Sequence, residues 1–150
     1  MLRPPLALVL LRASRWFDAQ LLERLEGHGW PRLTPAQSLV FAHLSKGGTS
    51  PSELARRLGS SRQAAHELVA GLKAYDLLDV VEDPARRRGR LVMLTPTGRR
   101  LADDARRVLA DLEGQLGQER VATLHGLLEE LDLVPGTAGS APPRPRARTR

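Results

Sequence analysis

The sequence predicts a mainly α-helical fold with one small β-hairpin, and three observations support this class. Apolar residues recur at helical spacing through most of the 150 residues. Several segments combine a hydroxyl residue with proline, glutamate or glutamine in the way that is typical of helix starts. One region near the middle of the chain has the short β-branched runs of two strands. Aromatic residues make up only 3%, so leucine, alanine and valine must form the core.

The first predicted helix runs from about residue 4 to Gly27. An apolar run from Leu6 to Leu11 follows Arg3, which faintly resembles a secretory signal, but Arg12 ends the run and no cleavage site follows. No apolar stretch approaches the roughly 20 residues that span a bilayer. We therefore expect an ordered helix in a cytoplasmic protein without a membrane partner.

Three segments are typical of capping boxes, in which a hydroxyl side chain caps a helix and a glutamate or glutamine three residues later reaches back. They are Thr34–Gln37, Ser50–Glu53 and Ser60–Gln63. Proline follows the cap in the first two, at a helix position where no N–H is needed. Each box follows a glycine or proline break, so we expect three short helices to begin there.

The two helices on either side of Gly59 predict a helix-turn-helix. Ala55 is small enough for the second helix to cross the first, and Gly59 can adopt the left-handed conformation of the turn. The leucines that would pack the pair together are Leu54, Leu58, Leu68 and Leu72. The N-terminal end of the second helix favours phosphate oxygens through its dipole.

The rest of the chain changes period twice. Residues 77–82 and 90–95 predict two strands around the basic loop Asp83–Gly89. Helical stripes then return from Leu101 to Leu116 and, after Gly117, from Val121 to Leu131. Glycine, proline, alanine and arginine dominate residues 134–150, which we expect to form a disordered Pro/Arg-rich tail.

The net charge of +6 is unevenly distributed. Residues 50–100 carry ten basic and six acidic side chains, whereas residues 101–140 carry three basic and eight acidic ones. Positive charge concentrated on the helix-turn-helix and hairpin indicates a polyanionic partner. Cysteine is absent, the four histidines lack ligand spacing, and no catalytic or phosphate-loop motif is present, so we expect no enzyme activity, metal or cofactor.

Five motifs, in this order and spacing, resemble the MarR family of bacterial transcription regulators: Leu33–Gln37, Glu53–Gly59, Ser61–Arg62, Asp83–Arg88 and Leu94–Gly98. The resemblance runs from roughly Leu6 to Leu131. It implies a winged helix-turn-helix domain flanked by terminal dimerisation helices. The expected division is an N-terminal dimerisation helix (1–32), the winged DNA-binding region (33–95), C-terminal dimerisation helices (96–133) and the tail (134–150).

The resemblance also implies that a homodimer binds a palindromic operator in double-stranded DNA, as a repressor that a small-molecule effector releases. Arginine and glutamine can form paired hydrogen bonds to guanine and adenine edges, and a hairpin arginine can enter the minor groove. The residues expected to contact DNA are Ser61, Arg62, Gln63, His66, Arg87, Arg88 and Arg90. The effector-binding residues are not predicted.

Four positions depart from the family's pattern, and one of them is His66, which stands at a threonine-like position of the second helix. Arg86 stands where an aspartate usually braces the minor-groove arginine, which is Arg88 here. Glu67 stands where a basic residue is common, so it would repel phosphate or accept from a cytosine amino group. Asp76 replaces the glycine after the second helix and tolerates left-handed geometry less well. These departures leave one alternative, a helical dimerisation or interaction module with weak or lost specific DNA binding.

Overall fold

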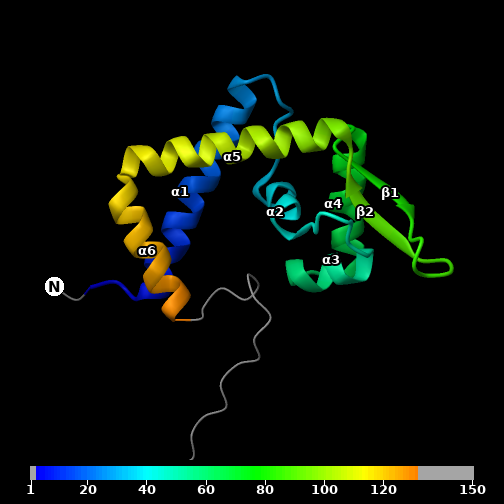
Figure 1. The fold of residues 1–150 in the computed structure, drawn as a ribbon, viewed down its shortest axis with the longest axis horizontal. Helices are drawn as coiled ribbons and strands as arrows, with labels where there is room; N and C mark the ends of the chain where they lie inside the picture. Colours follow the sequence, from blue (N-terminus) through cyan, green and yellow to red (C-terminus); the bar gives the residue numbers. More distant parts are fainter. Residues whose placement is uncertain (1–2, 132–150) are drawn as a thin grey trace, which may run out of the picture. The chain divides into compact units, whose positions relative to one another are not determined.

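The computed structural model describes residues 3–131, and in this part of the chain the predicted mainly helical class with one hairpin is confirmed (Figure 1). The elements are α1 (Leu6–Gly27), α2 (Pro35–His43), α3 (Pro51–Leu58), α4 (Arg62–Ala74), β1 (Leu78–Glu82), β2 (Arg90–Leu94), α5 (Pro96–Leu116) and α6 (Gln118–Glu130). The predicted tail at 134–150 lies outside the described residues. The chain forms two compact units, which divide after Leu112.

Apolar side chains from the helix-turn-helix, the hairpin and the start of α5 form one core in the first unit. Its buried members are Leu33, Val40, Leu54, Val69, Leu72, Leu77, Leu78, Val92 and Leu101. Leu54 and Leu72 are fully buried, and the half-buried Leu58 and Leu68 pack against the same cluster, as the sequence predicts. Each fully buried leucine contributes about 2 kcal/mol to the stability of the fold.

The predicted capping box forms completely at the start of α2, whereas only one of its two hydrogen bonds forms at the start of α3. Thr34 Oγ1 accepts from the N–H of Gln37 at 3.1 Å, and Gln37 Oε1 accepts from the N–H of Thr34 at 3.0 Å. At α3, Ser50 Oγ accepts from the N–H of Glu53 at 3.3 Å. The Glu53 carboxylate does not return to the cap, because it binds two arginines in stronger, charge-assisted hydrogen bonds.

The predicted capping box at Ser60–Gln63 is wrong by one residue. Ser61 caps α4, and its Oγ accepts from the N–H of Ala64 at 3.1 Å. Gly59 has a left-handed conformation (φ 63°, ψ 29°), and the N–H of the residue after it donates to the Ala55 carbonyl at 3.1 Å. Ser60 therefore belongs to the C-terminal motif of α3, and the next residue, Ser61, is the N-cap of α4.

The hairpin is fastened to the helix-turn-helix by a bridge that the sequence did not indicate. β1 and β2 pair in antiparallel register, with Val80 opposite Val92. Thr49, in the loop before α3, donates its N–H to the Val92 carbonyl at 3.0 Å and accepts from the Val92 N–H at 2.8 Å. The buried Thr49 hydroxyl accepts from the N–H of Ser45 at 2.9 Å. A single bridging residue has no strand pattern, so periodicity could not reveal it.

The turn between α4 and β1 is built on Asp76, which adopts a left-handed φ of 56° despite being an aspartate. Its N–H donates to the Lys73 carbonyl, and the N–H of Leu77 donates to the Leu72 carbonyl, which completes the end of α4. The left-handed conformation costs roughly 1 kcal/mol for a non-glycine residue. A hydrogen bond from Thr97 Oγ1 to Asp76 Oδ2 at 3.2 Å offsets part of that cost.

The start of α5 packs directly on this turn. The N–H of Thr95 donates to the Leu77 carbonyl at 3.1 Å, and Thr95 Oγ1 accepts from the N–H of Gly98 at 2.9 Å. A Cβ at Gly98 would lie 2.0 Å from the Leu77 carbonyl oxygen. This approach of two backbones requires glycine, since a methyl group cannot occupy that space.

A second cluster of the first unit joins α1 to α5 through Leu21, Leu25, Val108 and Leu112. Trp30 packs against both clusters, and its Nε1 donates to Asp104 Oδ2 at 2.7 Å. His28 Nδ1 lies 2.9 Å from the same oxygen. The hydrogen bonds from His28 and Trp30 lower the pKa of the Asp104 carboxyl, which therefore remains ionised. Trp30 is thus a core residue, whereas Trp16 is 42% exposed.

The second unit contains α6, which begins after Gly117. The φ of 100° at Gly117 breaks the helical path, as predicted from the sequence. Leu124 and Leu127 of α6, and Leu131 at its C-cap, are all at least half exposed. Among residues 3–131, no helix combines the length and apolar character needed to cross a membrane.

Replacing Gly98 by alanine should lower the free energy of unfolding by about 3 kcal/mol, because the new methyl group overlaps the Leu77 carbonyl. Urea denaturation followed by circular dichroism measures this. Gly114→Ala, in the same helix, is the matched control, since its Cβ meets nothing within 4 Å. That variant should gain up to about 1 kcal/mol. Equal stability of Gly98→Ala and the wild type would contradict the contact.

Candidate nucleic-acid interface

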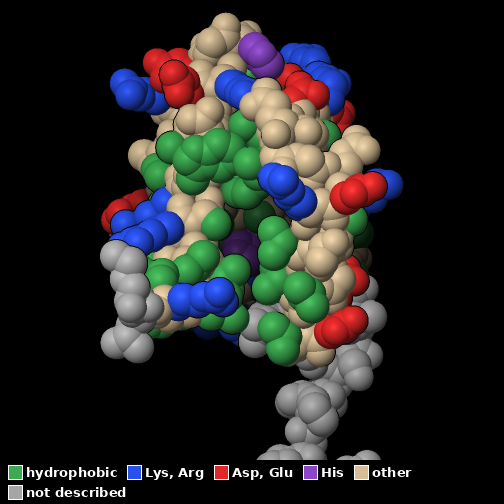
Figure 2. All heavy atoms as spheres, turned by 90° about the vertical axis from the view of Figure 1, so that its left-hand side faces the viewer, with side chains coloured by type: hydrophobic (Ala, Val, Ile, Leu, Met, Phe, Trp, Pro, Cys, Tyr) green, Lys and Arg blue, Asp and Glu red, His purple; other side chains and the backbone are tan. Residues whose placement is uncertain are grey.

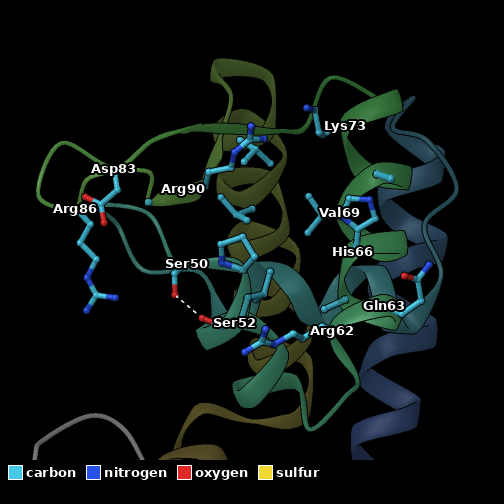
Figure 3. Close-up of a pocket in the computed structure, with 17 residues that line it drawn as sticks. Ser50, Ser52, Arg62, Gln63, His66, Val69, Lys73, Asp83, Arg86 and Arg90 are labelled. Atoms are coloured by element: carbon cyan, nitrogen blue, oxygen red, sulfur yellow. Dashed lines mark hydrogen bonds between the residues drawn. The ribbon is translucent and has the colours of Figure 1, made fainter.

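A cleft of about 870 Å³ lies between α4 and the hairpin (Figure 3). Its polar and charged lining includes Ser50, Ser52, Arg62, Gln63, His66, Lys73, Asp83, Arg86 and Arg90. Apolar side chains that include Val69, Val80 and Val92 form the rest of its wall. The cleft is therefore a cationic groove with an apolar floor, assembled from α3, α4 and the hairpin.

Helix periodicity determines which side chains of α4 reach solvent. Ala65, Val69 and Leu72 are buried against the core. Arg62 and His66, one turn apart, are exposed on the arc beside Val69, and both line the cleft. Because the Ser61 hydroxyl already caps α4, this serine supports the helix end and does not line the cleft.

The structure divides the predicted contact residues into two groups. Arg62, Gln63, His66 and Arg90 come together on the cleft. Arg87 and Arg88 lie outside it, with exposed side chains in the loop between the strands. The predicted residues thus form a helix-and-strand surface and a separate hairpin tip.

Asp83 organises the hairpin tip. Its Oδ1 accepts from the N–H of Ala85 at 2.9 Å, its carbonyl accepts from the N–H of Arg86 at 3.2 Å, and its N–H donates to the Gly89 carbonyl at 2.9 Å. These bonds order the loop where the aspartate expected at position 86 is absent. Arg88 adopts a left-handed φ of 60° at the tip.

Arg86 is a cleft residue that sequence reasoning missed. It lines the groove beside Asp83 and Arg90, although the sequence placed it only in a basic loop (Figure 3). Loop residues have no periodicity that predicts the direction of their side chains. Its place in the basic run Arg86–Arg88 and its departure from the family's aspartate were the available signals.

The arginines of α3 are engaged within the protein. Glu53 Oε1 accepts from Arg56 Nη2 at 2.6 Å and from Arg57 Nε at 3.0 Å. Arg57 Nη1 also donates to the His43 carbonyl at 2.8 Å and to Ser45 Oγ at 2.9 Å. The hydrogen bonds from Arg56 and then Arg57 lower the pKa of the Glu53 carboxyl to about 2. Arg57 therefore links α3 to the end of α2.

The cleft and hairpin arginines differ from those of α3. In the described part of the chain, Arg62, Arg86, Arg87, Arg88 and Arg90 form no ion pair. Their charges are exposed to solvent and available to an anion. Residues 3–131 contain no cluster of three or more histidines and carboxylates suited to a metal ion. The unpaired arginines favour binding of a polyanion.

Comparison with known proteins agrees with this geometry. A sequence profile of the MarR family matches residues 33–89, which include the helix-turn-helix, β1 and the whole hairpin loop. A sequence comparison with curated proteins finds no match.

Three solved structures illustrate the structural similarity. The transcriptional regulator PA4135 is 27% identical, with a TM-score of 0.66 over 89% of this chain and 100% of its own. The reduced form of MarR from E. coli is 23% identical, with a TM-score of 0.70 over 87% and 98%. MepR, a regulator of a Staphylococcus aureus multidrug efflux pump, is 17% identical, with a TM-score of 0.63 over 86% and 98%. The fold of MarR-family regulators therefore extends beyond the profile match.

The lowered pKa of Glu53 predicts how stability depends on pH. Its folded pKa of about 2 lies below the ordinary value of 4.5, so the carboxylate stabilises the fold above pH 4.5. This contribution is lost as the pH falls from 4.5 through about 2. Glu53→Gln should therefore be less stable than the wild type at pH 7. Its stability should also fall less than that of the wild type as the pH is lowered, because it has no carboxylate to protonate at this position. Thermal unfolding at pH 7, 4.5 and 2.5 measures the difference.

Glu129→Gln on α6 is the control, because that glutamate forms no ion pair among the described residues. A constant difference in unfolding temperature between Glu53→Gln and the wild type at all three pH values would show that the arginine pairs add nothing.

Proposed function

We propose that this chain, which has a winged helix-turn-helix domain of the MarR family, is a transcription regulator that binds double-stranded DNA. One observation carries the proposal. The cleft brings Arg62, Gln63 and His66 of α4 together with Arg86 and Arg90 of the hairpin, and these arginines form no ion pair within the described chain. Cationic groups on the exposed side of a helix and on an adjacent hairpin suit the two grooves and the intervening backbone of a duplex.

Each part of this surface has a role in the proposal. α4 lies in the major groove, where Arg62 and Gln63 can bond base edges. Arg88 at the hairpin tip enters the minor groove, whose negative potential attracts arginine. Arg86 and Arg90 face the phosphates between the two grooves, and supply affinity that does not depend on sequence.

Homodimerisation is the second part of the proposal, with residues 1–32 and 96–133 as the dimerisation regions. Hydrophobic side chains are open to solvent on the face shown in Figure 2. α1 exposes Leu6, Leu8, Val9, Leu10, Leu11 and Trp16, and α6 exposes Leu124 and Leu127. A single chain leaves these apolar stripes uncovered, which favours a partner. Two recognition helices about 34–36 Å apart would then read a palindromic operator.

The proposed regulator is a cytoplasmic repressor without catalytic activity. A small-molecule effector that binds better to a dimer with a different helix spacing would shift the population away from the DNA-competent form. The similarity to MepR, which regulates an efflux pump, is compatible with this response but does not name the effector.

A fluorescence anisotropy titration tests the proposal. The full chain is titrated against fragments of its own promoter region and against random DNA at several salt concentrations, and light scattering measures its mass. We expect a dimer that binds one fragment at least a thousandfold more tightly than random DNA. Equal binding to all fragments at every salt concentration would favour the alternative module that lacks specific DNA binding.

Arg88→Ala should weaken binding to every operator variant and reduce the slope of log Kd against log salt by about one, because one cation leaves the DNA. Alanine keeps the Cβ, so the backbone strain at φ 60° is unchanged. Arg106→Ala is the control, since that exposed arginine on α5 pairs with Asp103. If Arg88→Ala leaves the salt slope unaltered, this arginine does not contact the duplex.

A further inference from the structure

We propose that Glu67 is a positioning residue for base readout, which holds the Gln63 amide in the orientation that recognises adenine. This inference rests on the proposed function, because it concerns the surface of α4 that would enter the major groove. It goes beyond that function by assigning a role to the glutamate that departs from the family's pattern.

The two side chains form a pair on the exposed surface of α4. Gln63 Nε2 donates to Glu67 Oε1 at 3.1 Å, across one helical turn. Both residues are exposed, and Figure 3 shows Gln63 extending outward from the first turn of α4. Glu67 forms no ion pair with any described lysine or arginine, so its partner is a neutral amide.

The chemistry of the pair fixes which way the amide points. An ionised carboxylate is only an acceptor, so the nitrogen of Gln63 must face Glu67 and its oxygen must face away. One N–H of the amide is used in this bond. The second N–H and Oε1 remain, side by side, as one donor and one acceptor. Adenine presents the complementary pair, N7 as acceptor and N6–H as donor, in the major groove.

Without Glu67 the amide has no such preference. A solvent-exposed glutamine rotates freely, and binding must then fix its torsions at a cost of about 1 kcal/mol or more. A flipped amide would also place its donor and acceptor in the wrong order for adenine. Glu67 therefore lowers the cost of the correct contact and excludes the reversed one.

The charge of Glu67 supports a role in selectivity. A carboxylate beside the DNA weakens binding to every sequence, because it repels phosphate. Glu67 would weaken binding to every sequence through its charge, and it would strengthen the contact with adenine by orienting Gln63. The two effects together raise the ratio of specific to non-specific affinity and lower the affinity itself. As a helix pair alone, Gln63–Glu67 would contribute only a few tenths of a kcal/mol to α4.

The test measures Kd at one salt concentration for the best operator, for its single-base variants and for random DNA. Glu67→Gln removes the charge and introduces an amide that can donate as well as accept, so the Gln63 amide can bond it in either orientation. Glu67→Ala removes both the charge and the hydrogen-bond partner. Gln63→Ala removes the reader. Thermal unfolding verifies that each exposed substitution leaves the fold intact.

We expect the wild type to prefer adenine at one position of each half-site by about tenfold or more. Glu67→Gln should bind all DNA more tightly and lose part of that preference, because its amide can also stabilise the reversed orientation of Gln63. Glu67→Ala should also bind more tightly but reduce the preference to about twofold, and it should have no effect on preference when Gln63 is already alanine.

Two outcomes would overturn the inference while leaving the proposed function standing. In the first, Glu67→Ala keeps the full adenine preference, so that the glutamate acts only through its charge. In the second, Gln63→Ala keeps it, so that another residue reads the base. A wild type that prefers no operator over random DNA would instead remove the proposed function itself.

Discussion

The contact between Gly98 and the Leu77 carbonyl sets the position of the hairpin relative to α4. The chain leaves α4 through the left-handed Asp76, forms β1 and β2, and returns to the same point, where the Thr95 N–H bonds the Leu77 carbonyl. The two ends of the hairpin are thus held together against the end of α4. This close junction places the hairpin beside α4, on the other side of the cleft, and it allows no side chain at Gly98, where a Cβ would lie 2.0 Å from the Leu77 carbonyl oxygen.

Arginine has two distinct uses in this protein. Arg56 and Arg57 pair with Glu53, and Arg57 also ties α3 to the end of α2 through the His43 carbonyl. The single carboxylate of Glu53 offsets one of their two positive charges, and their hydrogen bonds within the protein tie them to the fold. The cleft and hairpin-tip arginines have no carboxylate partner in the described chain, so the positive potential that a duplex would meet comes from them.

Local patterns predicted most of the secondary structure because they act over a few residues. The box Thr34–Gln37, the left-handed Gly59 and the strands around Asp83–Gly89 depend on neighbours in the chain, and all were found as expected. The capping box predicted at Ser60–Gln63 was wrong by one residue, because the Ser60 N–H donates to the Ala55 carbonyl at the end of α3 and Ser61 caps α4 instead. The capping pattern of α4 by itself does not reveal that the C-terminal motif of α3 uses the same serine.

The sequence by itself determined the order of the elements, the helix-turn-helix with its small Ala55 and left-handed Gly59, and four of the residues that meet on the cleft. Tertiary structure alone decided the Thr49–Val92 bridge and the Gly98 contact with Leu77, because each joins segments far apart in the chain. It also decided that Arg86 lines the cleft, because a loop residue has no periodicity that gives its direction. Helix caps and turns follow local hydrogen bonding, whereas the approach of two backbones depends on the packing of the whole core.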